Sequence, residues 1–350
     1  MSKLPVGILG ATGAVGQRFV QLLAGHPWFE VAELAASDRS AGKPYTQACT
    51  WRLPGAPPAP VAGLTVTNCD GPFRSRLLFS GLDSSVAGEV EAALAAKGHA
   101  VVSNSRNHRM AADVPLLIPE VNADHLAALE AQRRRTGGGY VVTNPNCSVV
   151  GLAMALAPLH RAFGIVSAHV VTLQALSGAG YPGVASMDIA DNVIPYIGGG
   201  EEEKIEIEPR KILGRWTGSG FDLAPFAISA SVHRVDVSDG HTMAAFVKLK
   251  HPTEAAAAAE AIAAFRGEPQ ERRLPTAPER PIHVLVEQDR PQPRLDRDRE
   301  NGMAVAVGRV RGDGNGGLKL EALVHNTIRG AAGAAILNAE LLRARGLLPQ

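Results

Sequence analysis

A cysteine that follows an Asn-Pro-Asn turn is the side chain best placed for covalent chemistry. The turn Asn144-Pro145-Asn146 delivers Cys147 to the start of a predicted helix, Val149 to Arg161. The helix dipole and the free N–H groups at a helix start lower the pKa of a thiol, so we expect Cys147 to be a nucleophilic thiolate. The alternative is a small core cysteine, which we expect for Cys49 and Cys69 because neither has such a setting.

A nucleophilic thiol needs a partner that handles protons, and His241 is the candidate. It follows a turn at Ser238-Asp239-Gly240 and precedes a predicted strand, Thr242 to Lys250. A histidine at the mouth of a strand can face a thiol at a domain junction. Taken alone, a structural histidine is the simpler interpretation. Arg234 lies in an earlier predicted strand among apolar residues, so its charge requires a carboxylate or a substrate as partner.

Two further cations stand in polar segments. Arg109 belongs to the segment Asn104 to Met110, and Lys204 follows Glu201-Glu202-Glu203. Each is consistent with a solvated surface charge. Because Gly198-Gly199-Gly200 directly precedes Glu201, a mobile loop is equally consistent with the second segment.

A glycine-rich turn lies between the first predicted strand and the first predicted helix. It reads Gly10-Ala11-Thr12-Gly13-Ala14-Val15-Gly16. Glycines at such a turn let the backbone approach a pyrophosphate, which binds the free N–H groups of the helix start. The spacing is GxxGxxG, and a turn of this kind can also be purely structural. Its position at the first strand–helix junction favours a dinucleotide.

The second predicted strand ends at Ser37-Asp38-Arg39-Ser40, which bears on the choice of cofactor. An NAD site places an acidic residue here to bind the ribose hydroxyls, whereas an arginine with two hydroxyls suits a 2′-phosphate. We therefore expect NADP. Asp38 opposes this assignment unless its carboxylate points away, and it leaves mixed cofactor use open.

Two different patterns of predicted elements position these groups. In the first 150 residues, apolar runs at Leu4 to Leu9, Val31 to Ala36, Leu77 to Phe79 and Ala100 to Val102 alternate with helical stretches at Val15 to Leu23 and Val86 to Ala96. This alternation predicts a Rossmann-like, doubly wound α/β domain with a parallel sheet.

The second half predicts an α+β domain on a mostly antiparallel sheet. Its predicted strands are Val170 to Gln174, Ala230 to Val237, Thr242 to Lys250, Ile282 to Glu287, Met303 to Arg311 and Leu318 to Val324, with a helix at Ala255 to Phe265. Leu318 to Val324 alternates apolar and charged residues, which is typical of a strand with one solvent-exposed face. We expect a dinucleotide-binding domain at 1–147, a catalytic and dimerisation domain at 148–326, and a final helix, 327–350, that returns to complete the first domain.

Composition excludes several classes of protein. The 350 residues hold 35 Lys and Arg against 34 Asp and Glu, a net charge of +1, so no global field attracts nucleic acid or an anionic membrane. No apolar run reaches the length of a membrane span. Three cysteines without CxxC or ligand spacing indicate a reducing compartment and no structural metal site. We expect a cytoplasmic enzyme with a small-molecule substrate.

These segments together resemble the aspartate-semialdehyde dehydrogenase family, especially its archaeal and fungal-type branch, over nearly the whole chain. The most specific matches are Leu173 to Pro182 and the Asn-Pro-Asn-Cys turn. The other matches are Gly10 to Gly16, Ser37 to Tyr45, Ser103 to Met110, Val114 to Asn122, Asp191 to Lys204, His233 to His241 and Asn326 to Gly333.

The resemblance implies a reaction and three catalytic roles. Cys147 is the nucleophile, His241 the acid/base, and Gln174 the residue that orients the thioester intermediate. The implied reaction is the NADPH-dependent reductive dephosphorylation of L-aspartyl 4-phosphate to L-aspartate 4-semialdehyde, in lysine, threonine and methionine biosynthesis. The family also implies a homo-oligomer, a dimer or a tetramer joined through the second domain.

The resemblance also implies how the substrate is held. Arg234 binds the α-carboxylate and Glu201 the ammonium, while Arg109 and Lys204 bind the phosphate. A zwitterionic acyl phosphate needs both cations and one anion in its pocket, and this set supplies them.

The remaining implied roles concern NADP, with Asn326 near the nicotinamide. The implied cofactor residues are Gly10, Thr12, Gly13, Ala14, Val15, Gly16, Ser37, Arg39, Ser40, Ser80, Ser177, Gly178 and Asn326. Two departures bear on this region: Arg106 stands where a lysine is expected, and Gly81-Leu82-Asp83 replaces the more usual Ala-Leu-Pro.

Three alternatives remain at this stage. A malonyl-CoA or succinyl-CoA reductase would keep Cys147, His241 and NADPH but bind a substrate without an ammonium, against which Glu201 argues. An N-acetyl-glutamyl-phosphate reductase would not explain the match at Leu173 to Pro182. A non-catalytic dinucleotide-binding protein would lack the cysteine or the histidine, and both are present.

Overall fold

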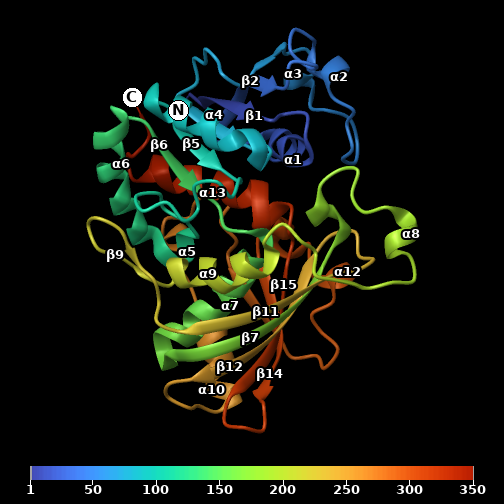
Figure 1. Ribbon diagram of the computed structural model, residues 1–350, viewed down its shortest axis with the longest axis vertical. Coiled ribbons are helices and arrows are strands. Elements are labelled where there is room, and N and C mark those ends of the chain that lie inside the picture. Colours follow the sequence, from blue (N-terminus) through green and yellow to red (C-terminus); the bar gives the residue numbers. More distant parts are fainter. Residues whose placement is uncertain (1, 350) are drawn as a thin grey trace.

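The structure is a computed structural model that describes residues 2–349. Figure 1 shows two sheets, one in the upper half built mainly from the N-terminal residues and one in the lower half built from the later residues. The first sheet has six strands in the order β3-β2-β1-β4-β5-β6, and every neighbouring pair is parallel. Its strands are β1 (Leu4–Leu9), β2 (Phe29–Ala36), β3 (Val66–Asn68), β4 (Leu77–Ser80), β5 (Ala100–Ser103) and β6 (Tyr140–Thr143).

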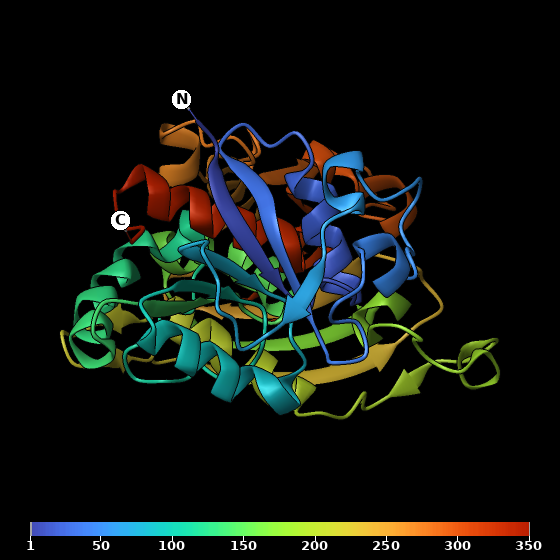
Figure 2. The same cartoon turned by 90° about the horizontal axis from the view of Figure 1, so that it is seen from above.

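Both faces of this sheet are covered, which explains why its strands are nearly continuous apolar runs. Ile8 on one face packs in a cluster with Phe19 of α1 (Ala14–Leu23) and Ile336 of α13 (Gly333–Ala344). Leu9 on the other face packs in a cluster with Leu94 of α4 (Ser84–Ala96). Figure 2 shows α13, in red, and α4, in teal, on opposite sides of the parallel strands. The predicted doubly wound arrangement is confirmed.

The C-terminal helix returns to the first sheet, but it is not one regular helix. A π-helical turn, η4 (Ile328–Ala332), precedes α13. The helix is anchored by a buried pair in which His26 Nε2 lies 2.7 Å from Glu340 Oε1. The predicted single helix from Thr327 is therefore wrong in its first turn, where η4 packs against the start of α7 (Cys147–Phe163).

The second sheet is mixed, with antiparallel pairs in the majority. Its order is β13-β14-β15-β12-β7-β11-β8. The pairs β7/β11 and β13/β14 are parallel, and the other neighbours are antiparallel. The strands are β7 (Ile165–Gln174), β8 (Ile194–Pro195), β11 (Ala227–Arg234), β12 (His241–Leu249), β13 (Ile282–Leu285), β14 (Val305–Gly312) and β15 (Leu318–Val324).

Helices cover one face of this sheet. These are α7, α9 (Glu201–Ile212) and α10 (Ala255–Ala263), whose apolar residues share one core cluster with the inward side chains of the strands. The outward side chains alternate with them: Val171 and Leu173 of β7 and Phe246 of β12 are exposed. One face of the sheet is thus uncovered in the single chain.

The structure decides one open alternative and corrects one predicted strand. The segment from Glu201, for which a solvated surface charge and a mobile loop were equally consistent, is the helix α9, which places Ile205 and Ile212 in the core. The strand expected at Ala230 to Val237 begins and ends three residues earlier, at Ala227–Arg234. The sequence shows the apolar runs and the glycines, but which of them are buried depends on contacts distant in sequence.

Shorter elements lie between these strands and helices along the chain. They are α2 (Tyr45–Ala48), α3 (Ala59–Ala62), α5 (Pro119–Asn122), η1 (Ala123–Ala127), α6 (Ala128–Thr136), η2 (Leu176–Ala179), α8 (Ser186–Ile189), β9 (Arg215–Trp216), β10 (Phe221–Asp222), α11 (Glu268–Glu271), α12 (Pro293–Asp296) and η3 (Arg299–Gly302). Among the residues that the structure describes, no helix is both long and apolar enough to span a membrane.

Candidate active site

Cys147 and His241 meet where the two halves join. Cys147 is the first residue of α7, and Asn146 caps this helix by accepting a hydrogen bond from Ser148 N at 2.9 Å. His241 is the first residue of β12 and is fully buried. The Cys147 Sγ lies 3.2 Å from His241 Nε2. The structure therefore brings together the two residues that the sequence nominated separately.

The second ring nitrogen of His241 is held by the backbone. Ala175 N donates to Nδ1 at 3.0 Å. An imidazole nitrogen that accepts a hydrogen bond carries no proton, so the neutral ring has its hydrogen on Nε2. The Nε2–H group therefore donates to the Cys147 sulfur.

Both members of the pair are neutral at rest. Burial raises the pKa of Cys147 to about 12, with added repulsion from Glu201, and Arg109 and Arg234 offset only part of this. Burial, followed by repulsion from Arg234, lowers the pKa of His241 to about 3. The expected lowering of the thiol pKa by the helix start is outweighed, because desolvation of a thiolate acts more strongly than partial charges on N–H groups.

Three further predicted residues surround the sulfur. Arg234 ends β11, is buried, and donates through Nη1 to Ala175 O at 2.6 Å. Gln174 ends the neighbouring strand β7, is buried, and donates through Nε2 to Thr172 Oγ1 at 3.3 Å. Glu201 begins α9 and accepts a hydrogen bond from Asn146 Nδ2 at 2.8 Å. One carboxylate and one guanidinium thus flank the thiol.

The two cations assigned to phosphate are each paired with a carboxylate of α9. Lys204 Nζ lies 3.0 Å from Glu201 Oε2, and Arg109 Nη1 lies 2.9 Å from Glu208 Oε1. Arg109 is buried, and its Nε has no hydrogen-bond partner among residues 2–349. A buried donor of this kind is costly unless an acceptor occupies the site, which makes Arg109 suited to bind an anion.

The turn after β7 lies against the catalytic pair. A Cβ on Gly178 would come within 2.8 Å of His241 Cε1 and 2.9 Å of Arg234 Nη1, so only glycine fits there. Asn326 donates to Ser177 Oγ at 2.8 Å and accepts from Gly240 N at 2.9 Å. Asn326 therefore ties together the two turns on either side of His241.

The glycine-rich turn has the shape that a pyrophosphate needs. Gly10 has a φ of +73°, and a Cβ on Gly16 would come within 2.1 Å of Gly10 O, so the turn and the helix packing require both. Gly13 has no such constraint, since the nearest atom to its Cβ would be 3.4 Å away. It is exposed and caps α1 without a side chain, which leaves the first N–H groups of this helix free. An exposed backbone of this form fits a dinucleotide phosphate.

The predicted ribose end lies at the carboxyl end of β2. Ser37 and Arg39 are exposed, while Ser40 is buried and its backbone N donates to Ser37 O at 2.8 Å. Arg39 has no ion-pair partner among residues 2–349. Ser80 is different, because its side chain is buried and its Oγ accepts a hydrogen bond from Leu82 N at 3.5 Å.

Both departures from the family pattern have a local role. Arg106 donates to Gly199 O at 3.0 Å, in the glycine segment before α9. Asp83 caps α4 by accepting a hydrogen bond from Ser85 N at 2.8 Å. Each residue therefore stabilises an element next to the site.

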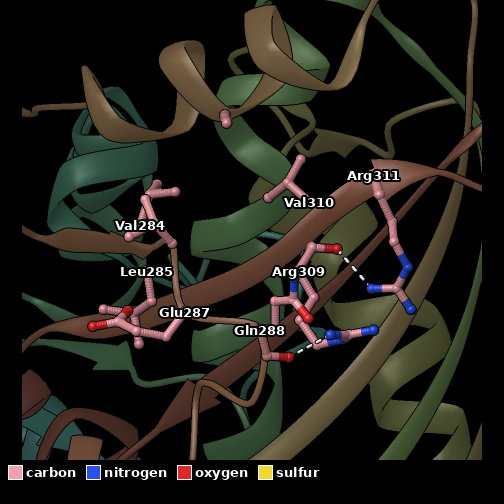
Figure 3. A pocket seen from close by; sticks show the side chains of 9 residues that line it. Val284, Leu285, Glu287, Gln288, Arg309, Val310 and Arg311 are labelled. Atoms are coloured by element: carbon pink, nitrogen blue, oxygen red, sulfur yellow. Dashed lines mark hydrogen bonds between the residues drawn. The ribbon is translucent and has the colours of Figure 1, made fainter.

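A separate cavity is lined by other residues. It measures about 430 Å³ beside strands β13 and β14, where Figure 3 shows Arg309 and Arg311 with Val284 and Val310. None of the predicted site residues lines it. It is not the candidate active site.

Three groups near the thiol were not identified from the sequence. Glu208 accepts a hydrogen bond from Asn146 N at 2.6 Å, Ala175 N contacts His241, and Gly330 packs on Cys147. Only Glu208 could have been identified from the sequence, because it is an acidic residue seven positions after Glu201 and so lies on the same face of a helix. The contacts of the Ala175 backbone amide and of Gly330 produce no pattern in the sequence.

Comparison with known proteins agrees with this geometry. The family model "Semialdehyde dehydrogenase, NAD binding domain" matches residues 5–129, and "Semialdehyde dehydrogenase, dimerisation domain" matches residues 156–329. The chain is 49% identical to an aspartate-semialdehyde dehydrogenase of Archaeoglobus fulgidus, over 97% of this chain and 98% of the relative. It is 48% identical to that of Schizosaccharomyces pombe, over 99% of this chain and the full length of the relative.

The fold matches a solved structure of the same family. The crystal structure of aspartate-semialdehyde dehydrogenase with NADP from Candida albicans superposes with a TM-score of 0.91 at 40% identity, over 99% of this chain and all of the other. Sequence, fold and the paired Cys147 and His241 lead to the same conclusion. The chain belongs to the aspartate-semialdehyde dehydrogenase family, whose members are oxidoreductases.

Proposed function

We propose that this chain is an NADP-dependent aspartate-semialdehyde dehydrogenase, and the observation that carries the proposal is the 3.2 Å contact between Cys147 Sγ and His241 Nε2. The products of the reductive direction are aspartate 4-semialdehyde, phosphate and oxidised cofactor. The NADP-bound relative supports the cofactor, and the exposed Gly13 and the unpaired Arg39 fit it. The dinucleotide-binding part comprises residues 1–147 with the C-terminal helix, and the catalytic part comprises residues 148–326.

The charges around the thiol suit an amino-acid acyl phosphate. Arg234 binds the α-carboxylate, and Glu201 binds the ammonium, exchanging its contact with Lys204 for one with substrate. Lys204 and Arg109 then bind the phosphate, which supplies an acceptor for the unpartnered Arg109 Nε. Such exchange leaves each buried charge paired in the complex, as a low-dielectric site requires.

The chemistry at sulfur follows from the hydrogen on His241 Nε2. The Cys147 thiol attacks the acyl carbon, the carbon–oxygen bond to phosphate breaks, and a thioester forms while the leaving phosphate takes the thiol proton. When bound, NADPH supplies the hydride that reduces this thioester. The resulting thiohemiacetal oxyanion collapses and expels the thiolate, which the Nε2–H group stabilises by donation. Gln174, buried beside Glu201, orients the thioester.

One assay tests this function and its rival. Aspartate semialdehyde, phosphate and NADP should give phosphate-dependent NADPH absorbance, and Cys147→Ser should abolish it. Malonyl-CoA with NADPH, run in parallel, should give no oxidation. Oxidation by malonyl-CoA without a reaction of the semialdehyde would keep the mechanism and replace the substrate.

We also propose that the chain forms a homodimer through the uncovered face of the second sheet. Phe246 of β12 is paired with His169 of β7, and Val171 and Leu173 continue the same exposed face. The matching of residues 156–329 to a dimerisation domain supports this surface. Phe246→Glu should halve the mass in analytical ultracentrifugation. Val286→Glu, at an exposed site beside β13, is the control and should leave the mass unchanged.

The setting of this reaction is proposed to be the cytoplasm. All three cysteines are free, which suits a reducing compartment.

A further inference from the structure

Helix α9 carries four charged side chains on one face. Glu201, Lys204, Glu208 and Lys211 follow one another at intervals of three, four and three residues, the spacing of a single helical face. The first two lie at the candidate substrate pocket. The last two are fully buried, although buried charges are costly and are retained only with well-placed partners. Their partners show what they do.

Glu208 connects two parts of the active site. Its Oε1 accepts a hydrogen bond from Arg109 Nη1 at 2.9 Å, and its Oε2 accepts one from Asn146 N at 2.6 Å. Asn146 directly precedes Cys147 and also caps its helix. One carboxylate therefore links the candidate phosphate-binding arginine to the turn that carries the nucleophile.

Lys211 secures the backbone that carries the same arginine. Its Nζ donates to the carbonyl oxygens of Arg109, Ala111 and Val114 at 2.7, 2.8 and 2.9 Å. All three ammonium hydrogens are thereby used, so Lys211 has none left for a substrate. It can act only by holding the segment 109–114 against α9.

The Arg109 guanidinium is consequently fixed from two sides. Nη1 is held by Glu208 and Nη2 by Asn104 O at 2.8 Å, while Nε is buried without a partner among residues 2–349. A guanidinium that is restrained at two nitrogens presents its remaining donors in one orientation. Binding a phosphate then costs little additional side-chain entropy.

We propose that Glu208 is a positioning residue. It fixes the position of the Arg109 guanidinium relative to the turn that carries Cys147, and Lys211 anchors the Arg109 backbone. The proposal rests on the proposed function, in which Arg109 binds phosphate. Both oxygens of Glu208 act as acceptors, so no neutral side chain of equal size replaces it. In glutamine, one end is an NH₂ group that would face an N–H donor.

Glu208→Gln is the decisive variant, and Glu206→Gln is its matched control. Glu206 lies on the same helix and also accepts a backbone hydrogen bond, from Ala230 N at 3.1 Å, but it faces β11 instead of the site. In Glu208→Gln we expect kcat/KM for phosphate to fall about 100-fold, while KM for NADP stays within about twofold, because phosphate positioning is lost selectively. Glu206→Gln should stay within about twofold in both.

A second measurement does not depend on turnover. Phosphate should protect Cys147 of the unaltered enzyme from iodoacetamide, and Glu208→Gln should lose this protection. The variant should also alkylate faster at pH 8, since Arg109 then lacks its counter-charge beside the sulfur. Glu208→Asp keeps the charge but shortens the reach; it should lose protection without the faster alkylation. If Glu208→Gln does not fold, Glu208→Asp still tests whether Glu208 is needed for protection by phosphate.

The outcomes separate the two proposals. If the unaltered enzyme shows neither phosphate-dependent turnover nor phosphate protection, the proposed function fails. If it shows both and Glu208→Gln retains them, the positioning role is overturned. Equal losses in Glu206→Gln would also overturn it, since they would reveal a general effect of α9.

Discussion

Gly330 lies in direct contact with Cys147: a Cβ on Gly330 would come within 2.9 Å of the Cys147 Cβ and 3.1 Å of its Cα. The contact is made by the π-helical turn η4, which lies between Asn326 and α13. Irregular helical turns of this kind are frequent at functional sites. The turn places the C-terminal part of the chain directly on the nucleophile.

Gly330→Ala should therefore disturb the nucleophile more than the fold. The added methyl must displace Cys147, and we expect kcat to fall at least about tenfold, with about 1–3 kcal/mol lost from the free energy of unfolding. Steady-state kinetics and urea unfolding measure both. Ala331→Ser, one residue further and half-buried, is the control. Wild-type kcat in Gly330→Ala would contradict the contact.

The thiol at Cys147 should behave as an unusually weak acid. Its pKa is raised to about 12, so the thiolate fraction should increase tenfold with each pH unit between pH 7 and 10. We expect the iodoacetamide rate at Cys147, followed by peptide mass spectrometry, to rise with a slope near one on a logarithmic scale. An ordinary thiol would level off above its pKa of about 8.5. A plateau below pH 8 would instead indicate a thiolate–imidazolium pair.

Arg39 should decide between the two nicotinamide cofactors. Arg39→Ala removes a charge-assisted hydrogen bond worth roughly 1.5–3 kcal/mol, so KM for NADP should rise about tenfold to hundredfold while KM for NAD changes little. Initial rates at varied cofactor concentration test this. Lys3→Ala removes the same charge next to the start of β1, at the opposite end of the sheet, and should have no effect. Equal losses with both cofactors would exclude a 2′-phosphate contact.

The buried pair Arg329–Glu120 should contribute strongly to stability. Its Nη2–Oε2 distance is 2.7 Å, and both side chains are fully buried. Glu120→Gln leaves the guanidinium unpaired in the core and should cost about 3–5 kcal/mol in the free energy of unfolding. Glu130→Gln breaks the exposed pair with Arg134 and should cost at most about 0.5 kcal/mol. Similar urea midpoints for the two variants would refute this difference.

Much of the fold and of the chemistry could be predicted from short segments of the sequence. The parallel sheet, the mostly antiparallel second sheet and the returning helix were predicted from apolar periodicity, since this pattern is local. The NADP cofactor and the family were predicted from motifs, and both predictions are confirmed. The individual roles of Cys147, His241, Arg109 and the other site residues stay predictions.

The electrostatic state of the site was decided only by the tertiary structure. The Asn-Pro-Asn-Cys turn predicted a lowered thiol pKa, yet burial beside Glu201 raises it. The glycines before Glu201 were equally consistent with a loop, yet α9 forms because its apolar face packs on α7 and β11. Burial and ion pairing depend on residues distant in sequence. The sequence by itself therefore determined which groups are predicted to do the chemistry, and the packing of α9, η4 and β12 around Cys147 determined their charge and position.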